Sequence, residues 1–210
     1  MGFGIAFLGY CFLLLHSAGF GAIGAPLLAY GFFLASKLHK KFLFASVSAL
    51  FMLPRGIFLL LDLFLPLIGV ELDLQNKYPT LNTATYLLFF LAWLSMIFFH
   101  CTAVRDIAKD NRHEKLEKMA MNRLYVSALF ILVACAMVFL QPVLNDPRMN
   151  ALMEILFYII LLVNLLWTHT CLVMITSERQ YEEDKEFVRE ENRKAEERKN
   201  KTEERKKKKR

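Results

Sequence analysis

Residues 151–176, ALMEILFYIILLVNLLWTHTCLVMIT, run directly into residues 177–210, SERQYEEDKEFVREENRKAEERKNKTEERKKKKR. The first segment is apolar almost throughout, whereas the second has almost no apolar residues. A transmembrane helix needs about 20 predominantly apolar residues. The change in composition at Ser177 therefore predicts a membrane-spanning helix that ends where a charged tail enters water.

The rest of the chain repeats the apolar pattern of its last span. Hydrophobic residues make up 56% of the sequence, and the mean hydropathy is +0.35, both above what a soluble domain usually shows. These features predict an all-α fold, a polytopic helical membrane bundle at 1–176 with a charged tail at 177–210. The helices are expected at approximately 3–16, 22–37, 42–68, 81–109, 113–141 and 147–176.

The number of spans depends on the first apolar run, Phe3–Ser36. As one helix it would be about 50 Å long, well above the roughly 30 Å of a hydrocarbon core. Its middle, HSAGFGAIGAP at 16–26, is rich in glycine and ends in Pro26. Glycine weakens a helix interior and proline breaks it. We therefore favour six helices, with five as the alternative.

Basic residues alternate between the connecting segments. The links 37–41 and 105–123 and the tail are basic, whereas 69–80 and 141–150 are not. The positive-inside rule then places the basic links and the C-terminus in the cytoplasm. The N-terminus is cytoplasmic with six helices and external with five. The basic balance indicates contact with the lipid bilayer rather than specific nucleic-acid binding.

The tail is expected to be a helix that continues the last span. No glycine or proline follows Pro147, and Glu, Lys, Arg and Ala are good helix formers. We expect helix to about Lys199 and fraying through 206–210. A charged helix fits better than a coiled coil, since no heptad is sustained. The tail would serve as a spacer, as a docking rod for a protein partner or as a lipid-contacting arm, and the simpler interpretation is a solvated charge run that orients the last span. Lys207 and Lys208 would suit a retrieval signal in an endoplasmic reticulum membrane.

Arg55 is the foremost candidate for a functional residue within the membrane. It lies in FMLPRGI at 51–57, in the middle of the expected third helix, and Asp62 follows two turns later on the same face. Ionisable groups within spans are costly and are functional candidates by default. The functional interpretation is a polar transport site at Arg55 and Asp62. The structural one is an ion pair, or Arg55 bonded to backbone carbonyls.

Two His and Cys pairs lie near the expected cytoplasmic end of the membrane. They are His100 with Cys101 and His169 with Cys171. Two Cys and two His could bind zinc or copper if their helices were adjacent. Neither pair has an established metal-site spacing, so buried core residues are the favoured interpretation and no cofactor is expected.

Small residues recur every four positions across the first two expected helices, at Gly21, Ala25 and Ala29. Such spacing lets helix backbones approach closely in lipid. Packing within the opening hairpin is the simpler interpretation, and a homo-oligomer is the alternative.

The opening MGFGIAFLGYCFLLL, the segment ending YGFFLASKL and the later WLSMIFFHCTAVRDIAKD together resemble uncharacterised small multi-pass membrane proteins of Gram-positive anaerobic bacteria. The resemblance covers about the first two-thirds of the chain and excludes the tail. It implies a bacterial cytoplasmic membrane. It implies no functional residues, because that group has no assigned activity.

No GxSxG, HExxH or Walker A pattern occurs in the sequence. The GxGxxG spacing of GFGAIG at 19–24 lies between two apolar helical segments and does not follow a strand, as a dinucleotide-binding motif would. We therefore expect no enzyme. The favoured function is a scaffold, assembly or regulatory protein that acts through helix packing and its charged tail. The alternative is a small transporter or channel built around Arg55 and Asp62.

Overall fold

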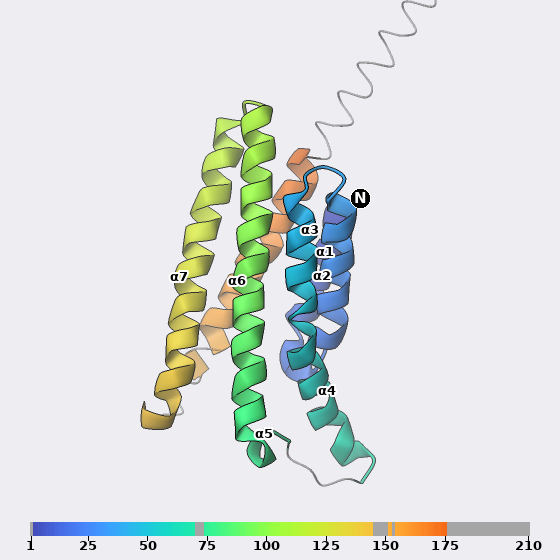
Figure 1. The fold of residues 1–210 in the computed structure, drawn as a ribbon, viewed down its shortest axis with the longest axis vertical. Coiled ribbons are helices and arrows are strands. Elements are labelled where there is room, and N and C mark those ends of the chain that lie inside the picture. The colour runs from blue at the N-terminus through green and yellow to red at the C-terminus, as the bar shows by residue number, and fades with distance from the viewer. Residues whose placement is uncertain (1, 70–73, 145–150, 153, 176–210) are drawn as a thin grey trace, which may run out of the picture. The chain divides into compact units, whose positions relative to one another are not determined.

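The computed structural model describes residues 2–69, 74–144, 151–152 and 154–175. These residues are helical, with short turns and no strand among them, which confirms the predicted all-α class (Figure 1). The chain divides into two units, Met1–Cys171 and Leu172–Arg210. The predicted helical tail and the start of the last helix at 147 lie outside the described residues.

The first apolar run forms two short helices. They are α1 (Gly2–Leu13) and α2 (Gly21–Ala35), separated by the 3₁₀ turn η1 (His16–Ala18). Gly19 ends the turn with a positive φ of 78°, a conformation that glycine adopts without steric cost. At 1.5 Å per residue, the two helices are about 18 and 22 Å long.

Glycines hold α1 and α2 in close antiparallel contact. A Cβ added at Gly9 would lie 3.0 Å from the Gly24 carbonyl oxygen, and one added at Gly31 would lie 2.8 Å from the Gly2 carbonyl oxygen. Gly9 and Gly24 are thus paired, and so are Gly2 and Gly31, two helical turns away. The two backbones can approach this closely because no side chain separates them.

The predicted third helix, 42–68, is two helices in the structure. They are α3 (Lys41–Leu50) and α4 (Leu53–Leu67), separated by a turn at 51–52. The division follows from Pro54, whose missing N–H cannot continue the hydrogen-bond ladder of α3 but is tolerated in the first turn of α4. Arg55 consequently lies in the first turn of α4, not in the middle of an unbroken helix.

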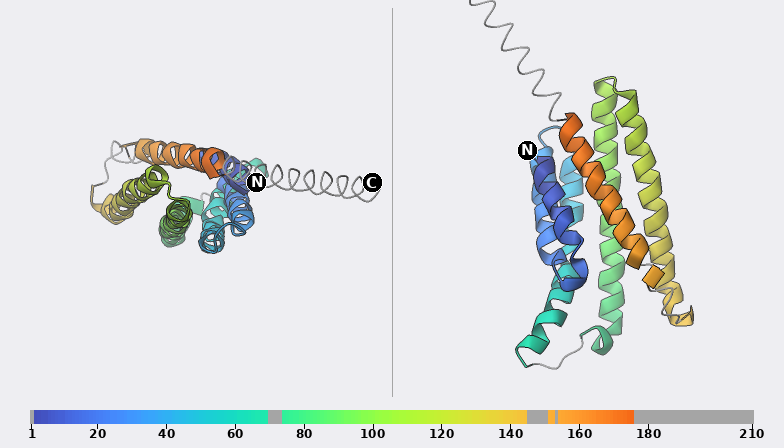
Figure 2. Two further views of the ribbon diagram at one scale, coloured as in Figure 1. Left: turned by 90° about the horizontal axis from the view of Figure 1, so that it is seen from above. Right: turned by 180° about the vertical axis from the view of Figure 1, so that it is seen from behind.

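Three long helices follow the short α5. Both α6 and α7 extend beyond their apolar stretches and pack against each other as an antiparallel pair. The helix that follows them contacts η1, α6 and α7 (Figure 2). Their bounds are α5 (Leu74–Lys77), α6 (Pro79–Asp110), α7 (Glu114–Leu144) and a last helix described over Glu154–Ile175.

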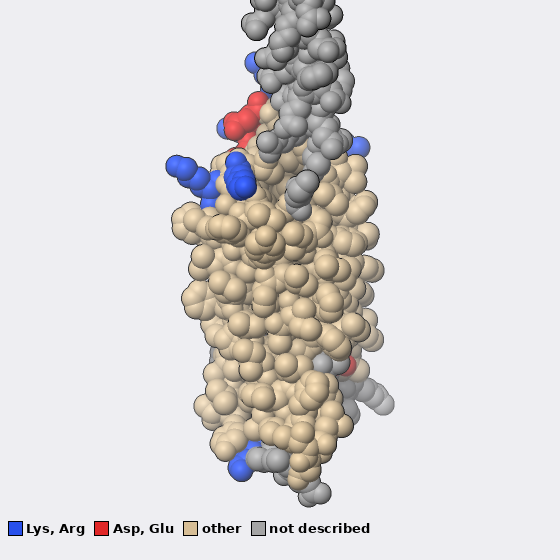
Figure 3. Space-filling model, turned by 90° about the vertical axis from the view of Figure 1, so that its right-hand side faces the viewer, with Lys and Arg blue, Asp and Glu red and all other residues tan. Residues whose placement is uncertain are grey.

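Four helical segments of the described chain are long and apolar enough to cross a membrane: α3 and α4 taken together across their turn (Lys41–Leu67), Pro79–Asp110, Glu114–Met137 and Glu154–Ile175. Their outward side chains are apolar too, as Leu129, at 67% exposure, and Leu91, at 58%, illustrate. Figure 3 shows charged side chains toward the two ends of one face, with a broad uncharged band between them. Such a band matches the apolar interior of a bilayer.

Candidate functional site

Arg55 is buried against α6. Its side chain is 6% exposed, and Nη1 donates to Asn82 Oδ1 at 2.5 Å and to Thr85 Oγ1 at 3.5 Å. The guanidinium carbon lies 4.6 Å from the centre of the Tyr86 ring, a cation–π distance. Nε is buried and has no hydrogen-bond partner among the described residues.

The position of Arg55 across the bundle follows from its partners on α6. Thr85 and Asn82 precede Arg105 by 20 and 23 residues, which is about 30 and 35 Å along the helix. A hydrocarbon core is about 30 Å thick. The apolar stretch of α6 between these residues and Arg105 is thus about as long as a hydrocarbon core is thick. If Arg105 lies at one edge of that core, the Arg55 guanidinium lies at the other edge.

The tip of the opening hairpin lies close to the same level. The His16 ring contacts the Phe157 ring at 4.3 Å between centres and stacks on Phe89 at 6.5 Å. Ser17 Oγ lies 3.2 Å from the Tyr158 hydroxyl oxygen. His16 Nδ1 is buried without a partner among the described residues. A histidine, two hydroxyls and the Arg55 site thus converge on one region of the bundle.

Asp62 does not form an ion pair with Arg55 in the structure. Its Oδ1 accepts the backbone N–H of Leu74 at 2.8 Å, and its Oδ2 accepts from Gln75 Nε2 at 2.8 Å. Asp62 therefore holds the start of α5 against α4. The two residues predicted as one site belong to separate hydrogen-bond networks, although the Asp62 charge still acts on Arg55 through space.

His100 lies in a cage of aromatic side chains. The ring is 1% exposed, and its Nε2 has no partner among the described residues. Because four aromatic rings surround it, the ring acts here as a core-filling aromatic group. Its ring neighbours are Phe3, Phe32, Phe42 and Trp167, at 4.9–6.3 Å between centres.

The other candidate metal ligands do not join His100. His169 packs on Phe7, with ring centres 5.8 Å apart, on a different contact surface. Cys101 and Cys171 are buried free thiols. Within the described residues, no group of three or more His, Cys, Asp or Glu side chains could hold a metal ion. His100, Cys101 and Cys171 therefore occupy core positions, whereas His169 is exposed, and the four do not form one ligand sphere among the described residues.

The predicted small-residue stripe packs within the chain. Gly21 faces Gly56, where an added Cβ would lie 3.4 Å from the Gly56 Cα. Ala25 and Ala29 are buried, and the Ala29 carbonyl accepts a 2.7 Å hydrogen bond from Ser46 Oγ. The stripe thus faces α3 and α4. A second set of glycines joins α1 to α2.

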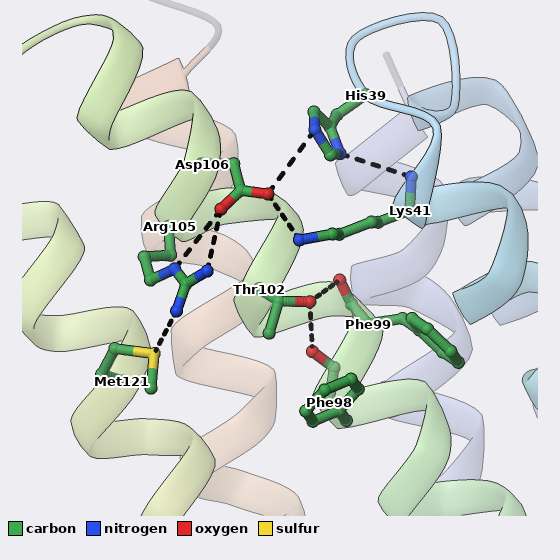
Figure 4. A network of polar contacts seen from close by, with 8 residues as sticks. All are labelled: His39, Lys41, Phe98, Phe99, Thr102, Arg105, Asp106 and Met121. Carbon is green, nitrogen blue, oxygen red and sulfur yellow. Dashed lines mark hydrogen bonds and ion pairs between the residues drawn. The ribbon is translucent and has the colours of Figure 1, made fainter.

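Asp106 gathers three basic groups at the other end of α6 (Figure 4). Lys41 Nζ donates to Oδ2 at 2.5 Å, Arg105 Nη2 donates to Oδ1 at 3.1 Å, and His39 Nε2 lies 3.7 Å from Oδ2. Partial burial opposes ionisation of Asp106, but the hydrogen bonds from Lys41 and Arg105 outweigh it and lower the pKa of this carboxyl. The contact fastens α3 to α6 just beyond the apolar stretch that ends at Val104.

Sequence reasoning did not identify the partners of Arg55 or the Asp106 contact. Asn82, Thr85 and Tyr86 are ordinary residues for the start of a span, and Asp106 is one acid within a basic link. Their roles depend on packing between α4 or α3 and α6. The sequence did contain one indication of this contact. Asn82 lies about one helical turn before Thr85 and Tyr86, so the three share a helix face that could meet an arginine within the membrane.

Comparison with known proteins gives no match to a protein family, to a curated protein or to a solved structure.

Proposed function

We propose that this chain is an integral membrane protein that acts through contacts with a partner protein rather than through catalysis, as a scaffold, assembly factor or regulator. One observation carries the proposal. The helices α6 and α7 continue beyond their apolar stretches and form a rigid, charged hairpin. We propose the bacterial cytoplasmic membrane as the location of the protein, with the hairpin on the cytoplasmic side. The charged tail would provide a further docking segment.

The turn of the hairpin has a defined geometry. Arg112 adopts a positive φ of 57°, the His113 N–H donates to the Ala108 carbonyl at 2.7 Å, and the Arg112 N–H donates to the Lys109 carbonyl at 3.1 Å. This pair of bonds is a Schellman motif, which ends a helix sharply. The turn is therefore fixed by its backbone and not by chance packing.

Buried residues hold the two arms of the hairpin together. Ala108, Leu116 and Ala120 are at most 2% exposed. The outer surface carries charge on both arms and on the turn between them. Its exposed charged residues are Lys109, Asp110, Arg112, Glu114, Lys115 and Lys118. A stiff charged projection loses little conformational entropy on binding, which suits it to recognise a partner.

Site-specific photo-crosslinking in living cells tests this function. A photoreactive amino acid at Lys115 should give a discrete protein adduct, whereas the same amino acid at Leu129, exposed on the apolar part of α7, should give lipid adducts only. The double change Lys115→Glu and Lys118→Glu should weaken the adduct. Identical adduct patterns at the two positions, or none at Lys115 in any growth condition, would count decisively against a docking role.

A second candidate function is a small transporter or channel centred on Arg55. The buried arginine without a carboxylate partner among the described residues favours it, because such groups line substrate and ion pathways. The close packing of α1, α2, α3 and α6 opposes it, since Met96, about 16 Å deeper than Thr85 on α6, is fully buried.

Cysteine accessibility separates the two candidates. In a variant whose four native cysteines are replaced by alanine, Met96→Cys should not react with a membrane-impermeant maleimide, whereas Ser17→Cys, which is exposed at the hairpin tip, should react when added reagent reaches that side. Reaction at Met96→Cys would establish a water path through the bundle and favour transport.

A further inference from the structure

The guanidinium of Arg55 has more donors than the described residues satisfy. An arginine side chain carries five N–H donors. The described acceptors, Asn82 Oδ1 and Thr85 Oγ1, both serve Nη1. The buried Nε has no partner among the described residues, and Tyr86 and Phe58 cover the guanidinium at 4.6 and 5.6 Å. A buried cation in such surroundings is stabilised by an anion that accepts from Nε.

The described carboxylates nearby are committed elsewhere. Both oxygens of Asp62 accept hydrogen bonds from the start of α5, and its charge acts on Arg55 only through space. Glu154 is exposed and acts electrostatically on Tyr86. Neither lies within the 4.0 Å of an ion pair with Arg55. Within the described residues, no carboxylate therefore pairs with the positive charge of Arg55.

The hairpin tip adds hydrogen-bonding groups beside the arginine. The Arg55 charge acts on His16, whose buried Nδ1 has no partner among the described residues. A neutral imidazole can donate from one ring nitrogen. The Ser17 and Tyr158 hydroxyls adjoin the tip. The tip lies near the Arg55 site because His16 stacks on Phe89, which is about one helical turn from Thr85 on α6.

We propose that Arg55 binds a phosphate group, with Nε as a principal donor and His16 as a second one. The planar fork of arginine matches phosphate oxygens. The bonded residues Asn82 and Thr85 lie about 30–35 Å from Arg105 along α6, which is where the phosphate layer borders the hydrocarbon core. A phospholipid headgroup and a free phosphate share this chemistry, and the experiment distinguishes them.

This binding site stands independently of the docking function proposed for the α6–α7 hairpin. If the protein transports a solute, the site names that solute as a phosphate compound. Crosslinking at Lys115 and phosphate binding at Arg55 use different ends of the bundle, so either result can fail without the other.

The test uses the full chain purified in mild detergent. Binding is measured by native mass spectrometry and by the unfolding midpoint, with three probes: short-chain phosphatidylglycerol, inorganic phosphate and diacylglycerol of the same chain length. The variants are Arg55→Lys, which keeps the charge without the fork, and Arg55→Gln. Lys77→Gln is the matched control, because Lys77 is an exposed cation that precedes α6 at the same end.

Phosphatidylglycerol should bind to the unsubstituted protein, and Arg55→Gln should weaken binding about tenfold or more, while Lys77→Gln changes it little. Comparable binding of inorganic phosphate would identify a free phosphate as the ligand source; its absence would identify the lipid headgroup. Equal affinity for diacylglycerol, or unchanged binding in Arg55→Gln, would overturn the proposal.

A measurement on the unsubstituted protein covers the case in which the Arg55 variants fail to fold. Solid-state NMR with ¹⁵N-labelled arginine should detect a ³¹P–¹⁵N contact of hydrogen-bonding length in phosphatidylglycerol bilayers. The same contact should persist in Lys77→Gln and in a chain with Arg105→Lys and Arg112→Lys, which removes two arginines from the opposite end. If the contact disappears in the variant with Arg105→Lys and Arg112→Lys, it arises from one of those arginines and not from Arg55, and the proposed site is refuted.

Discussion

The substitution Gly31→Ala should drive apart the two helices of the opening hairpin. A Cβ at Gly31 would lie 2.5 Å from the Ala6 backbone nitrogen and 2.8 Å from the Gly2 carbonyl oxygen. Ordinary contact begins near 3.4 Å, so the α1 backbone must retreat by nearly 1 Å. Both obstacles are backbone atoms, and a change of side-chain rotamer cannot relieve the clash.

The expected cost follows from two opposing terms. Alanine is better than glycine in a helix interior by up to about 1 kcal/mol. Overpacking costs about 1–3 kcal/mol, and a backbone clash belongs at the upper end of that range. We therefore expect Gly31→Ala to lower the free energy of unfolding by about 2 kcal/mol.

Gly4→Ala is the matched control on α1. A Cβ at Gly4 meets no atom within 4 Å, so only the gain in helix propensity remains. Unfolding of the protein from mixed micelles by rising dodecyl sulfate, followed through the fluorescence of the buried Trp93 and Trp167, should separate the two variants by about 3 kcal/mol. Equal stability, or a more stable Gly31→Ala, would refute close backbone contact as the basis of the hairpin.

Three further substitutions probe other contacts by the same unfolding measurement. Ser46→Ala removes the donor to the Ala29 carbonyl and should cost about 0.6–1.7 kcal/mol, as interhelical bonds in membranes do; no loss would mean that the bond contributes nothing net. His100→Phe should stay within about 1 kcal/mol of the unsubstituted protein, because Nε2 forms no bond among the described residues; a large loss would contradict a core-filling role. Asp106→Asn should cost under about 1 kcal/mol at neutral pH, and less at high salt. Since the pKa of Asp106 is lowered from its ordinary value of 3.8, its contribution is present above that pH and is lost as the pH falls through the lowered pKa; Asp106→Asn should lack this acid-dependent loss.

The helical class and the main breaks could be predicted because they depend on local composition. The glycine-rich segment before Pro26 separates α1 from α2, and charged links separate the later helices. The division at Pro54 was within reach too, because proline in the first turn of a helix is a common start. The apolar run at 42–68 does form one candidate span, Lys41–Leu67, but the prediction of an unbroken helix gave too little weight to this proline.

The depth and partners of Arg55 could not be predicted, because they depend on how α4 packs against α6. Counting along its own apolar run places Arg55 mid-membrane, whereas its bond to Asn82, 27 residues away, places the guanidinium near an edge. The same holds for Asp106, whose partner Lys41 is 65 residues away. In the sequence, Asp106 is one charged residue among many in a basic link, and nothing in that pattern indicates a contact with Lys41.

In the structure, neither helix of the first apolar run is long enough to cross a bilayer alone, which bears on the choice between five and six spans. Both counts assume that each opening helix either crosses the bilayer or forms part of a crossing. The helices α1 and α2 are about 18 and 22 Å long, and the pairing of Gly2 with Gly31 makes them antiparallel. The start of α1 and the end of α2 therefore lie at one end of the bundle, beside the basic link 37–41. The start of α1 and the link 37–41 thus lie on the same side, as the six-helix alternative expects, although neither α1 nor α2 is among the four helical segments long enough to span a bilayer. The tip of the hairpin packs on Phe89 and Phe157, beside the Arg55 site.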